Sequence, residues 1–141
     1  VNKDFNNLNA AQVITEKLLT KGAYLIMTRN SEGREYRGLA IAIQDIDSYS
    51  KRDYDKPFRD AKMGMLPPKL EQMLVSAGTG SFVCDSGYVF DPFCGSGTVP
   101  MEAMLAGYDV IGSDISDTCV KGTQENLEWF AKEFQVGERQ F

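Results

Sequence analysis

The sequence predicts an α/β fold whose strands run parallel. Short apolar segments at residues 87–91 and 108–114 have the length and composition of buried strands. Each is followed by a segment of helical periodicity, at residues 97–107 and 116–134, the second with Ser116 or Asp117 as candidate cap. Strand–helix–strand–helix order with short connections is typical of parallel strands joined by right-handed crossovers.

The N-terminal part predicts a small helix followed by a β-hairpin. Residues 8–21 place apolar side chains along one helical stripe, and Gly22 marks its end. Residues 22–28 and 34–44 predict two strands, and the four residues Asn30–Gly33 between them are a typical hairpin connection.

The middle of the chain predicts a basic linker. Residues 46–64 are charged, contain Pro57 and lack periodicity. Between residues 51 and 69 there are more basic than acidic side chains, and we interpret them as a solvated linker, with contact to a nucleic-acid backbone as the alternative. The stretch Pro67–Gly78 then predicts a helix, because a proline pair can open one and glycine can end it. Its apolar stripe consists of Leu70, Met73, Leu74 and Ala77.

We therefore divide the chain into an N-terminal region, residues 1–60, that holds the helix, hairpin and basic linker, and a ligand-binding region, residues 61–141. No run of residues approaches the roughly 18 apolar residues of a membrane span. The three cysteines (Cys84, Cys94 and Cys119) are odd in number and lack C-x-x-C spacing, which argues against a disulfide framework or zinc site and favours the cytoplasm.

Two further counts exclude classes of function. The chain contains no histidine, which excludes a Ser-His or Cys-His nucleophile pair within it and any histidine-ligated metal. The net charge of −5 argues against the whole chain being a nucleic-acid clamp.

The segment Asp91-Pro92-Phe93-Cys94-Gly95-Ser96-Gly97-Thr98 carries the chemistry. It lies where a predicted strand becomes a helix. Gly95 and Gly97 allow a sharp turn and close approach of a ligand, and the free N–H groups of a helix N-terminus favour an anionic group. Asp91 is a candidate ligand-binding residue in this segment, and the alternative is that it only stabilises the turn. Cys94 could be a nucleophile at a helix N-terminus, but without a partner base we interpret it as a packing residue.

Asp114 ends the next strand 19 residues after Gly95. An acidic residue about 20 residues after such a loop binds ribose hydroxyls in nucleoside-binding folds. The alternative is a helix N-cap. Pro100 replaces the third glycine or alanine of a dinucleotide fingerprint, which disfavours NAD or FAD, and the Gly-Lys-Ser/Thr of a phosphate loop is absent.

The run VFDPFCGSGTVPMEAMLAGYDVIGSDIS closely resembles the first two motifs of S-adenosylmethionine-dependent amino-methyltransferases. The preceding stretch from Ile43 to Gly78 is similar to the corresponding segment of RNA guanine-N2 methylases, among them tRNA guanine-N2 methyltransferases. The resemblance covers roughly residues 36–130. It implies a partial Rossmann-like methyltransferase sheet, S-adenosylmethionine as cofactor and RNA, such as tRNA, as substrate.

The resemblance also assigns roles to residues. It implies that Asp91 lies near the methionine ammonium, that Asp114 binds the ribose and that Ile115 flanks the adenine. Near the methionine end it nominates Met65, Leu66 and Pro67. The loop under the cofactor would comprise Pro92, Phe93, Cys94, Gly95 and Gly97, with Thr98 at the helix start.

One expected motif is missing. These enzymes hold the target nitrogen with a D/N-P-P-Y/F/W tetrapeptide, and Leu66-Pro67-Pro68-Lys69 lacks both its polar and its aromatic residue. We therefore expect a fragment of a methyltransferase, with no catalytic acceptor residue in this chain and the motif C-terminal to it in the RNA enzymes. A homodimer or a missing C-terminal half would complete its sheet. The alternatives are a DNA adenine or cytosine amino-methyltransferase and a non-catalytic module that binds the cofactor or assembles with a partner.

Overall fold

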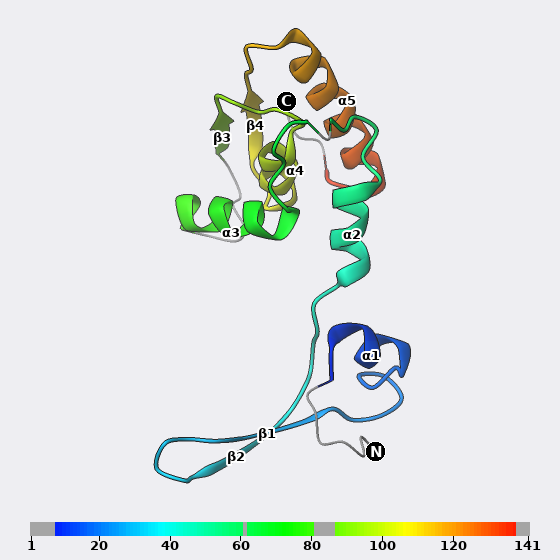
Figure 1. Ribbon diagram of the computed structural model, residues 1–141, viewed down its shortest axis with the longest axis vertical. Helices are drawn as coiled ribbons and strands as arrows, with labels where there is room; N and C mark the ends of the chain where they lie inside the picture. The colour runs from blue at the N-terminus through cyan, green and yellow to red at the C-terminus, as the bar shows by residue number, and fades with distance from the viewer. Residues whose placement is uncertain (1–7, 61, 81–86, 138–141) are drawn as a thin grey trace. The chain divides into compact units, whose positions relative to one another are not determined.

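The computed structural model describes residues 8–60, 62–80 and 87–137, and the chain divides into two units (Figure 1). Unit 1 is Val1–Asp47 and unit 2 is Ser48–Phe141. The division precedes most of the predicted linker, so residues 48–60 belong to the same unit as the glycine-rich segment.

In unit 1, a short helix precedes a hairpin. Helix α1 (Ala10–Thr15) begins with a capping box, in which Asn9 and Gln12 exchange side-chain-to-backbone hydrogen bonds. The helix is shorter than residues 8–21 because Lys17 adopts a left-handed conformation, with φ of 52°, which ends the helical hydrogen bonding.

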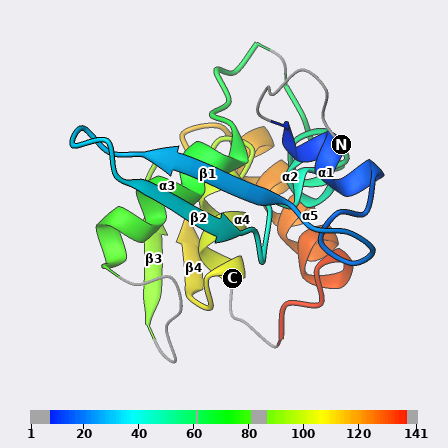
Figure 2. The ribbon, with the colours of Figure 1, turned by 90° about the horizontal axis from the view of Figure 1, so that it is seen from below.

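The hairpin confirms the predicted turn. Strands β1 (Leu25–Arg29) and β2 (Glu35–Leu39) pair antiparallel, as Figure 2 shows. The Asn30 carboxamide oxygen accepts from the backbone N–H of Arg34 at 2.9 Å, and Gly33 supplies the positive φ of 82° that the turn requires. Both strands are solvent-exposed along their whole length.

Two helices follow the hairpin, and from β3 onward strands and helices alternate as predicted. In chain order they are α2 (Ile46–Tyr54), α3 (Pro68–Thr79), β3 (Tyr88–Asp91), α4 (Thr98–Leu105), β4 (Asp109–Gly112) and α5 (Asp117–Glu133). Strands β3 and β4 pair parallel, in a register that places Asp91 opposite Gly112. Ser116 is the N-cap of α5 and accepts from the backbone N–H of Cys119 at 3.4 Å. The α/β class with parallel strands is therefore confirmed.

Helix α4 lies at the centre of unit 2, where it contacts α3, β3, β4 and α5 (Figure 1). Six of its eight residues are buried, so it lacks a polar face, as expected of a helix surrounded by protein. Phe130 of α5 is fully buried in the same core, which is formed by Val75, Met101, Ala103, Met104, Tyr108, Val110, Leu127 and Phe130.

The basic segment is not the solvated linker that we predicted. Residues 46–54 form α2, and Arg52 is 3% exposed, with its Nε donating to Glu102 at 2.7 Å. Lys51 forms an ion pair with Glu133. Lys56 is also buried. Periodicity did not reveal this helix because its buried contacts are made by charged side chains.

Helix α3 packs through a different face from its apolar stripe. Its buried residues are Pro68, Glu71 and Val75, which recur at helical spacing. The stripe of Leu70, Met73, Leu74 and Ala77 is exposed. The prediction of the helix was correct, but hydrophobic periodicity did not identify the face that α4 covers.

Two further sequence predictions can be compared with the structure. No helix in the described ranges combines the length and apolar character that a membrane-spanning helix requires. Cys94 and Cys119 are free thiols, both buried, whereas Cys84 lies outside the described residues.

Candidate functional site

The glycine-rich loop is fixed at its start by backbone hydrogen bonds to the segment after β4. The Asp91 carboxylate accepts from the backbone N–H of Phe93 at 3.0 Å, which turns the chain out of β3. The backbone N–H of Cys94 donates to the Ser113 carbonyl at 2.9 Å. The loop and the end of β4 therefore hold each other at the carboxyl edge of the two strands, where open α/β sheets bind ligands.

Both loop glycines are required by conformation. Gly95 and Gly97 have φ of 54° and 79°, in the left-handed region that favours glycine. A Cβ on Gly97 would lie 2.9 Å from the Thr123 methyl group on α5. The Thr123 hydroxyl donates to the Gly95 carbonyl at 3.0 Å. Helix α5 thus packs directly on the loop, and only glycine fits at position 97.

Asp114 is joined to this loop. One carboxylate oxygen accepts from the backbone N–H of Gly95 at 3.0 Å, and the other accepts from that of Ser116 at 2.9 Å. The Ser116 and Gly95 hydrogen bonds lower the pKa of Asp114, so this carboxylate is ionised at neutral pH. It is half-exposed, and each oxygen retains a lone pair for a ligand hydroxyl.

The loop is supported from behind by Asn126, which is fully buried on α5. Its amide accepts from the Phe58 backbone N–H at 2.7 Å and donates to the carbonyls of Phe58 and Ser96 at 2.9 and 2.8 Å. The Phe58 ring lies against Gly122, where a Cβ would be 2.2 Å from the ring. One amide therefore connects three segments that are distant in sequence.

Lys56 is a second support that the sequence did not reveal. The residue is 3% exposed, and its ammonium donates to the hydroxyls of Ser96 and Thr98, at 3.1 and 2.9 Å. Burial lowers the pKa of Lys56, and Asp53 opposes the shift. The only sequence signal was its position in the basic segment, which we had interpreted as solvated.

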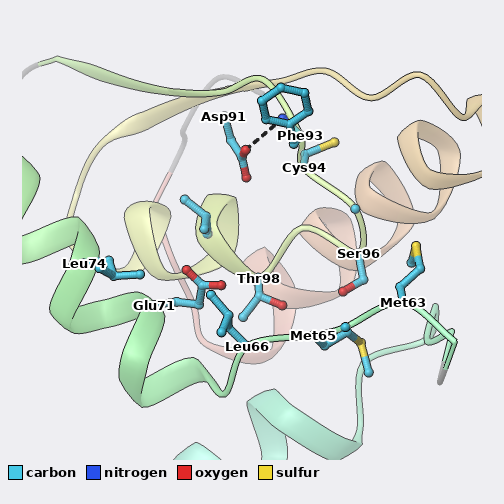
Figure 3. Close-up of a pocket in the computed structure, with 13 residues that line it drawn as sticks. Met63, Met65, Leu66, Glu71, Leu74, Asp91, Phe93, Cys94, Ser96 and Thr98 are labelled. Atoms are coloured by element: carbon cyan, nitrogen blue, oxygen red, sulfur yellow. Dashed lines mark hydrogen bonds between the residues drawn. The ribbon is translucent and has the colours of Figure 1, made fainter.

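A pocket of about 340 Å³ opens beside the loop (Figure 3). Seven of the predicted site residues line it: Met65, Leu66, Asp91, Phe93, Cys94, Gly95 and Thr98. Five do not, namely Pro67, Pro92, Gly97, Asp114 and Ile115. Pro67 is the N-cap of α3, and Ile115 is fully exposed beyond β4. The sequence missed Met63, Gly64, Glu71, Leu74, Ser96 and Val99.

Glu71 is the unexpected charged residue in this pocket. Its side chain projects from α3 into the cavity and is 4% exposed, and its Oε2 has no hydrogen-bond partner. Burial, followed by the nearby Asp91 carboxylate, raises the pKa of Glu71, and Lys56 opposes the shift. Glu71 and Asp91 are the charged residues among those that line the pocket.

Cys94 is 5% exposed, and burial raises the pKa of its thiol. A high pKa disfavours the thiolate, so its environment suits the packing interpretation rather than a nucleophile. In the part of the chain that the structure describes, no cluster of three or more Cys, Asp or Glu side chains is placed to bind a metal ion.

Comparisons with known proteins identify the family of this chain. A family model described as a DNA methylase, of the N6/N4 methyltransferase type, matches residues 27–125. The chain belongs to this methylase family. The match includes the glycine-rich loop, Asp114 and the first half of α5.

Individual methylases resemble the same region. A protein of Methanothermobacter thermautotrophicus, named tRNA (guanine(10)-N2)-dimethyltransferase, is 37% identical over 60% of this chain and 24% of its own length. Proteins of the same name from Pyrococcus abyssi and Methanocaldococcus jannaschii are 30% and 31% identical, over 69% and 78% of this chain. The chain spans 24–30% of the length of these relatives.

Proposed function

We propose that unit 2 is the S-adenosylmethionine-binding part of a methyltransferase that methylates the exocyclic N2 of guanine in tRNA. Its β3–α4–β4–α5 segment would be the opening part of a Rossmann-like methyltransferase sheet. The pocket beside a glycine loop whose backbone is bonded to Asp114 carries the proposal, together with membership of the methylase family.

The pocket has the chemistry that this cofactor needs. Its charged lining residues are two carboxylates, and the rest include apolar and sulfur-containing side chains such as Met65, Leu66 and Leu74. On its aliphatic chain S-adenosylmethionine carries two cationic groups, an ammonium and a sulfonium, and one carboxylate, so it is cationic overall. When bound, it supplies an electrophilic methyl group for direct displacement, a reaction that depends on positioning.

Each predicted residue then has a role in binding. Asp114 would accept hydrogen bonds from ribose hydroxyls, since its carboxylate is ionised and half-exposed. Phe93, 84% exposed, and the fully exposed Ile115 offer apolar surface for the adenine ring. Asp91 would face the methionine ammonium. Met65, Leu66 and Pro67 would pack near its aliphatic chain, while Pro92, Cys94, Gly95, Gly97 and Thr98 shape the loop.

The choice between RNA and DNA rests on the relatives. The family model is described as a DNA methylase, whereas three archaeal proteins that match this region are named for tRNA guanine-N2 dimethylation. The similarity to those three proteins, 30–37% identity over 60–78% of the chain, favours tRNA as the substrate. A DNA amino-methyltransferase is the second candidate.

Two measurements test the proposal. Calorimetric titration of the chain with S-adenosylhomocysteine should show one binding site, and absence of binding would overturn the cofactor assignment. The second measurement uses the natural full-length protein and follows transfer of labelled methyl groups to unmodified tRNA transcripts and to duplex DNA. The label should appear at guanine N2 in tRNA. Labelled DNA would favour the second candidate, and binding without any transfer would favour a non-catalytic module.

We also propose a cytoplasmic location, where tRNA substrates are available, and a partner that extends the two-stranded sheet. Large apolar side chains of β3 and β4 are exposed, including Tyr88, Phe90 and Ile111. A second copy of the chain or a further part of the same protein would cover them. Sedimentation equilibrium of the chain distinguishes a dimer from a monomer.

A further inference from the structure

Glu71 is a buried carboxylate with an unpaired oxygen. Its Oε2 is inaccessible to solvent and accepts no hydrogen bond. Lys56, the cationic side chain that opposes the rise of its pKa, donates to the hydroxyls of Ser96 and Thr98. A buried carboxylate without a partner is strongly unfavourable when ionised, so its retention requires an explanation.

A second carboxylate makes the ionised state still less favourable in the empty pocket. Figure 3 shows Glu71 and Asp91 extending toward the same cavity, one from α3 and the other from the end of β3. Their charges repel each other, and none of the residues that line the pocket is a lysine or arginine. A cationic group between them would offset both the burial of an unpaired Glu71 carboxylate and its repulsion from Asp91.

Glu102 provides an internal comparison. It is also a buried carboxylate with an unpaired oxygen, but its other oxygen accepts from Arg52 at 2.7 Å, and it does not line the pocket. Glu102 therefore has a cationic partner, Arg52, within the protein. A cation that binds Glu71 would have to occupy the pocket.

We propose that Glu71 is a ligand-binding residue that, with Asp91, holds the α-ammonium group of the bound cofactor. This inference rests on the proposed function. An ammonium has three N–H donors and can bind carboxylates on two sides at once, whereas a sulfonium has none. Glu71 therefore favours ligands that carry the amino-acid group of the cofactor over ligands that end in a simple thioether.

The test compares two ligands that differ in the amino acid. S-adenosylhomocysteine carries the ammonium and lacks the sulfonium, whereas methylthioadenosine lacks both. In calorimetric titrations, Glu71→Gln should weaken S-adenosylhomocysteine binding by roughly ten- to hundredfold, the range for a hydrogen bond to a charged group. Methylthioadenosine binding should change less than about threefold, since the adenosine contacts remain. The matched control is Glu125→Gln, an exposed change on α5 outside the pocket, which should leave both affinities unchanged.

The outcomes are distinguishable. If the wild-type chain binds S-adenosylhomocysteine and Glu71→Gln binds it equally well, the inference is overturned and the proposed function stands. If Glu71→Gln weakens S-adenosylmethionine binding alone, Glu71 contacts the sulfonium and the ammonium assignment is wrong. If the wild-type chain binds neither ligand, the proposed function itself fails, and the inference with it.

A stability measurement excludes a purely structural role. Without ligand at neutral pH, Glu71→Gln should raise the melting temperature, because it removes a buried carboxylate that has an unpaired oxygen and is repelled by Asp91. A structural carboxylate would give the opposite result. Glu71→Met, of similar size, repeats both measurements with an uncharged apolar side chain and should show the same pair of effects. A lower melting temperature in both variants would overturn the inference.

Discussion

The two sides of the candidate site treat their carboxylates in opposite ways. The loop wall consists of the glycine-rich loop and Asp114, which is bonded to the loop but does not line the pocket. There, Asp114 accepts two backbone N–H groups, which lower its pKa. On the α3 wall, Glu71 is buried with an unpaired oxygen, and burial raises its pKa. The contrast extends to the surroundings: behind the loop, Lys56 and Asn126 also have protein partners for their polar groups.

This difference indicates that the polar groups around the loop stabilise the fold, whereas Glu71 serves to bind a ligand. On the loop wall and behind it, the Asp114 carboxylate, the Lys56 ammonium and the Asn126 amide each have protein partners without a ligand. The α3 wall is incomplete until a cation enters. Changes to the loop backbone and its support should therefore act mainly on stability, and changes to Glu71 on the α3 wall mainly on binding.

Removal of the loop support should have the largest effect. Asn126→Ala leaves the Phe58 N–H and the Ser96 carbonyl without a buried partner, and each such loss costs about 1–3 kcal/mol. We expect a loss of roughly 3 kcal/mol or more in the free energy of unfolding, measured by urea denaturation with Trp129 fluorescence. Gln124→Ala, an exposed change on the same helix, should stay within about 0.5 kcal/mol. Similar losses in both variants would contradict the supporting role of Asn126.

A Cβ at Gly97 should have the next largest effect on stability. Gly97→Ala forces an L-residue into left-handed conformation and brings its methyl against Thr123. The two effects together should cost about 2–4 kcal/mol in thermal unfolding. Gly78→Ala is the matched control, because this glycine lies in α3 with open space around its Cβ position. It should be neutral or stabilise by up to about 1 kcal/mol, and an equal loss in both would refute the steric argument.

Asp114 tests whether the loop wall also contributes to binding. Asp114→Asn keeps the shape but removes the charge that strengthens hydrogen bonds with ribose hydroxyls. We expect affinity for S-adenosylhomocysteine to fall roughly ten- to hundredfold in calorimetric titration. Asp117→Asn, exposed in the first turn of α5, should retain wild-type affinity. Unchanged affinity in Asp114→Asn would refute the ribose assignment.

The opposite pKa shifts predict opposite, smaller effects of pH on stability. The pKa of Glu71 is raised above its ordinary 4.5, so the stability it contributes is present below that pH and is lost as pH rises through the raised pKa. The pKa of Asp114 is lowered below its ordinary 3.8, so its contribution is present above that pH and is lost as pH falls. We therefore expect urea midpoints measured from pH 3 to 8 to differ between Glu71→Gln and wild type mainly at neutral pH. For Asp114→Asn, the difference from wild type should instead disappear at acid pH. Parallel pH profiles would contradict the contrast between the walls.

Local sequence was sufficient for the loop wall. Gly95 and Gly97 identify a turn that few other residues can adopt, and Asp114 follows at the spacing set by one helix and one strand. The hairpin turn at Asn30–Gly33 was predictable for the same reason. In each case the residues that determine the conformation are neighbours in the sequence.

The α3 wall required the three-dimensional structure. Periodicity selected Leu70, Met73 and Leu74 as the packed stripe of α3, but these are exposed, and Glu71 lies on the covered face. Lys56 and Arg52 have the composition of a solvated linker, and only their partners on α4 and in the loop explain their burial. Burial of a charged residue depends on distant partners, which composition does not reveal.

The hydrogen bonds from Asn126 to Phe58 have a practical consequence for where the cofactor-binding unit can be shortened. A version that starts at residue 61 would keep every glycine of the loop. It would nevertheless lose the ammonium between Ser96 and Thr98 and open a void beside Gly122 that the Phe58 ring fills. Expression and design of this unit should therefore start no later than Ser48.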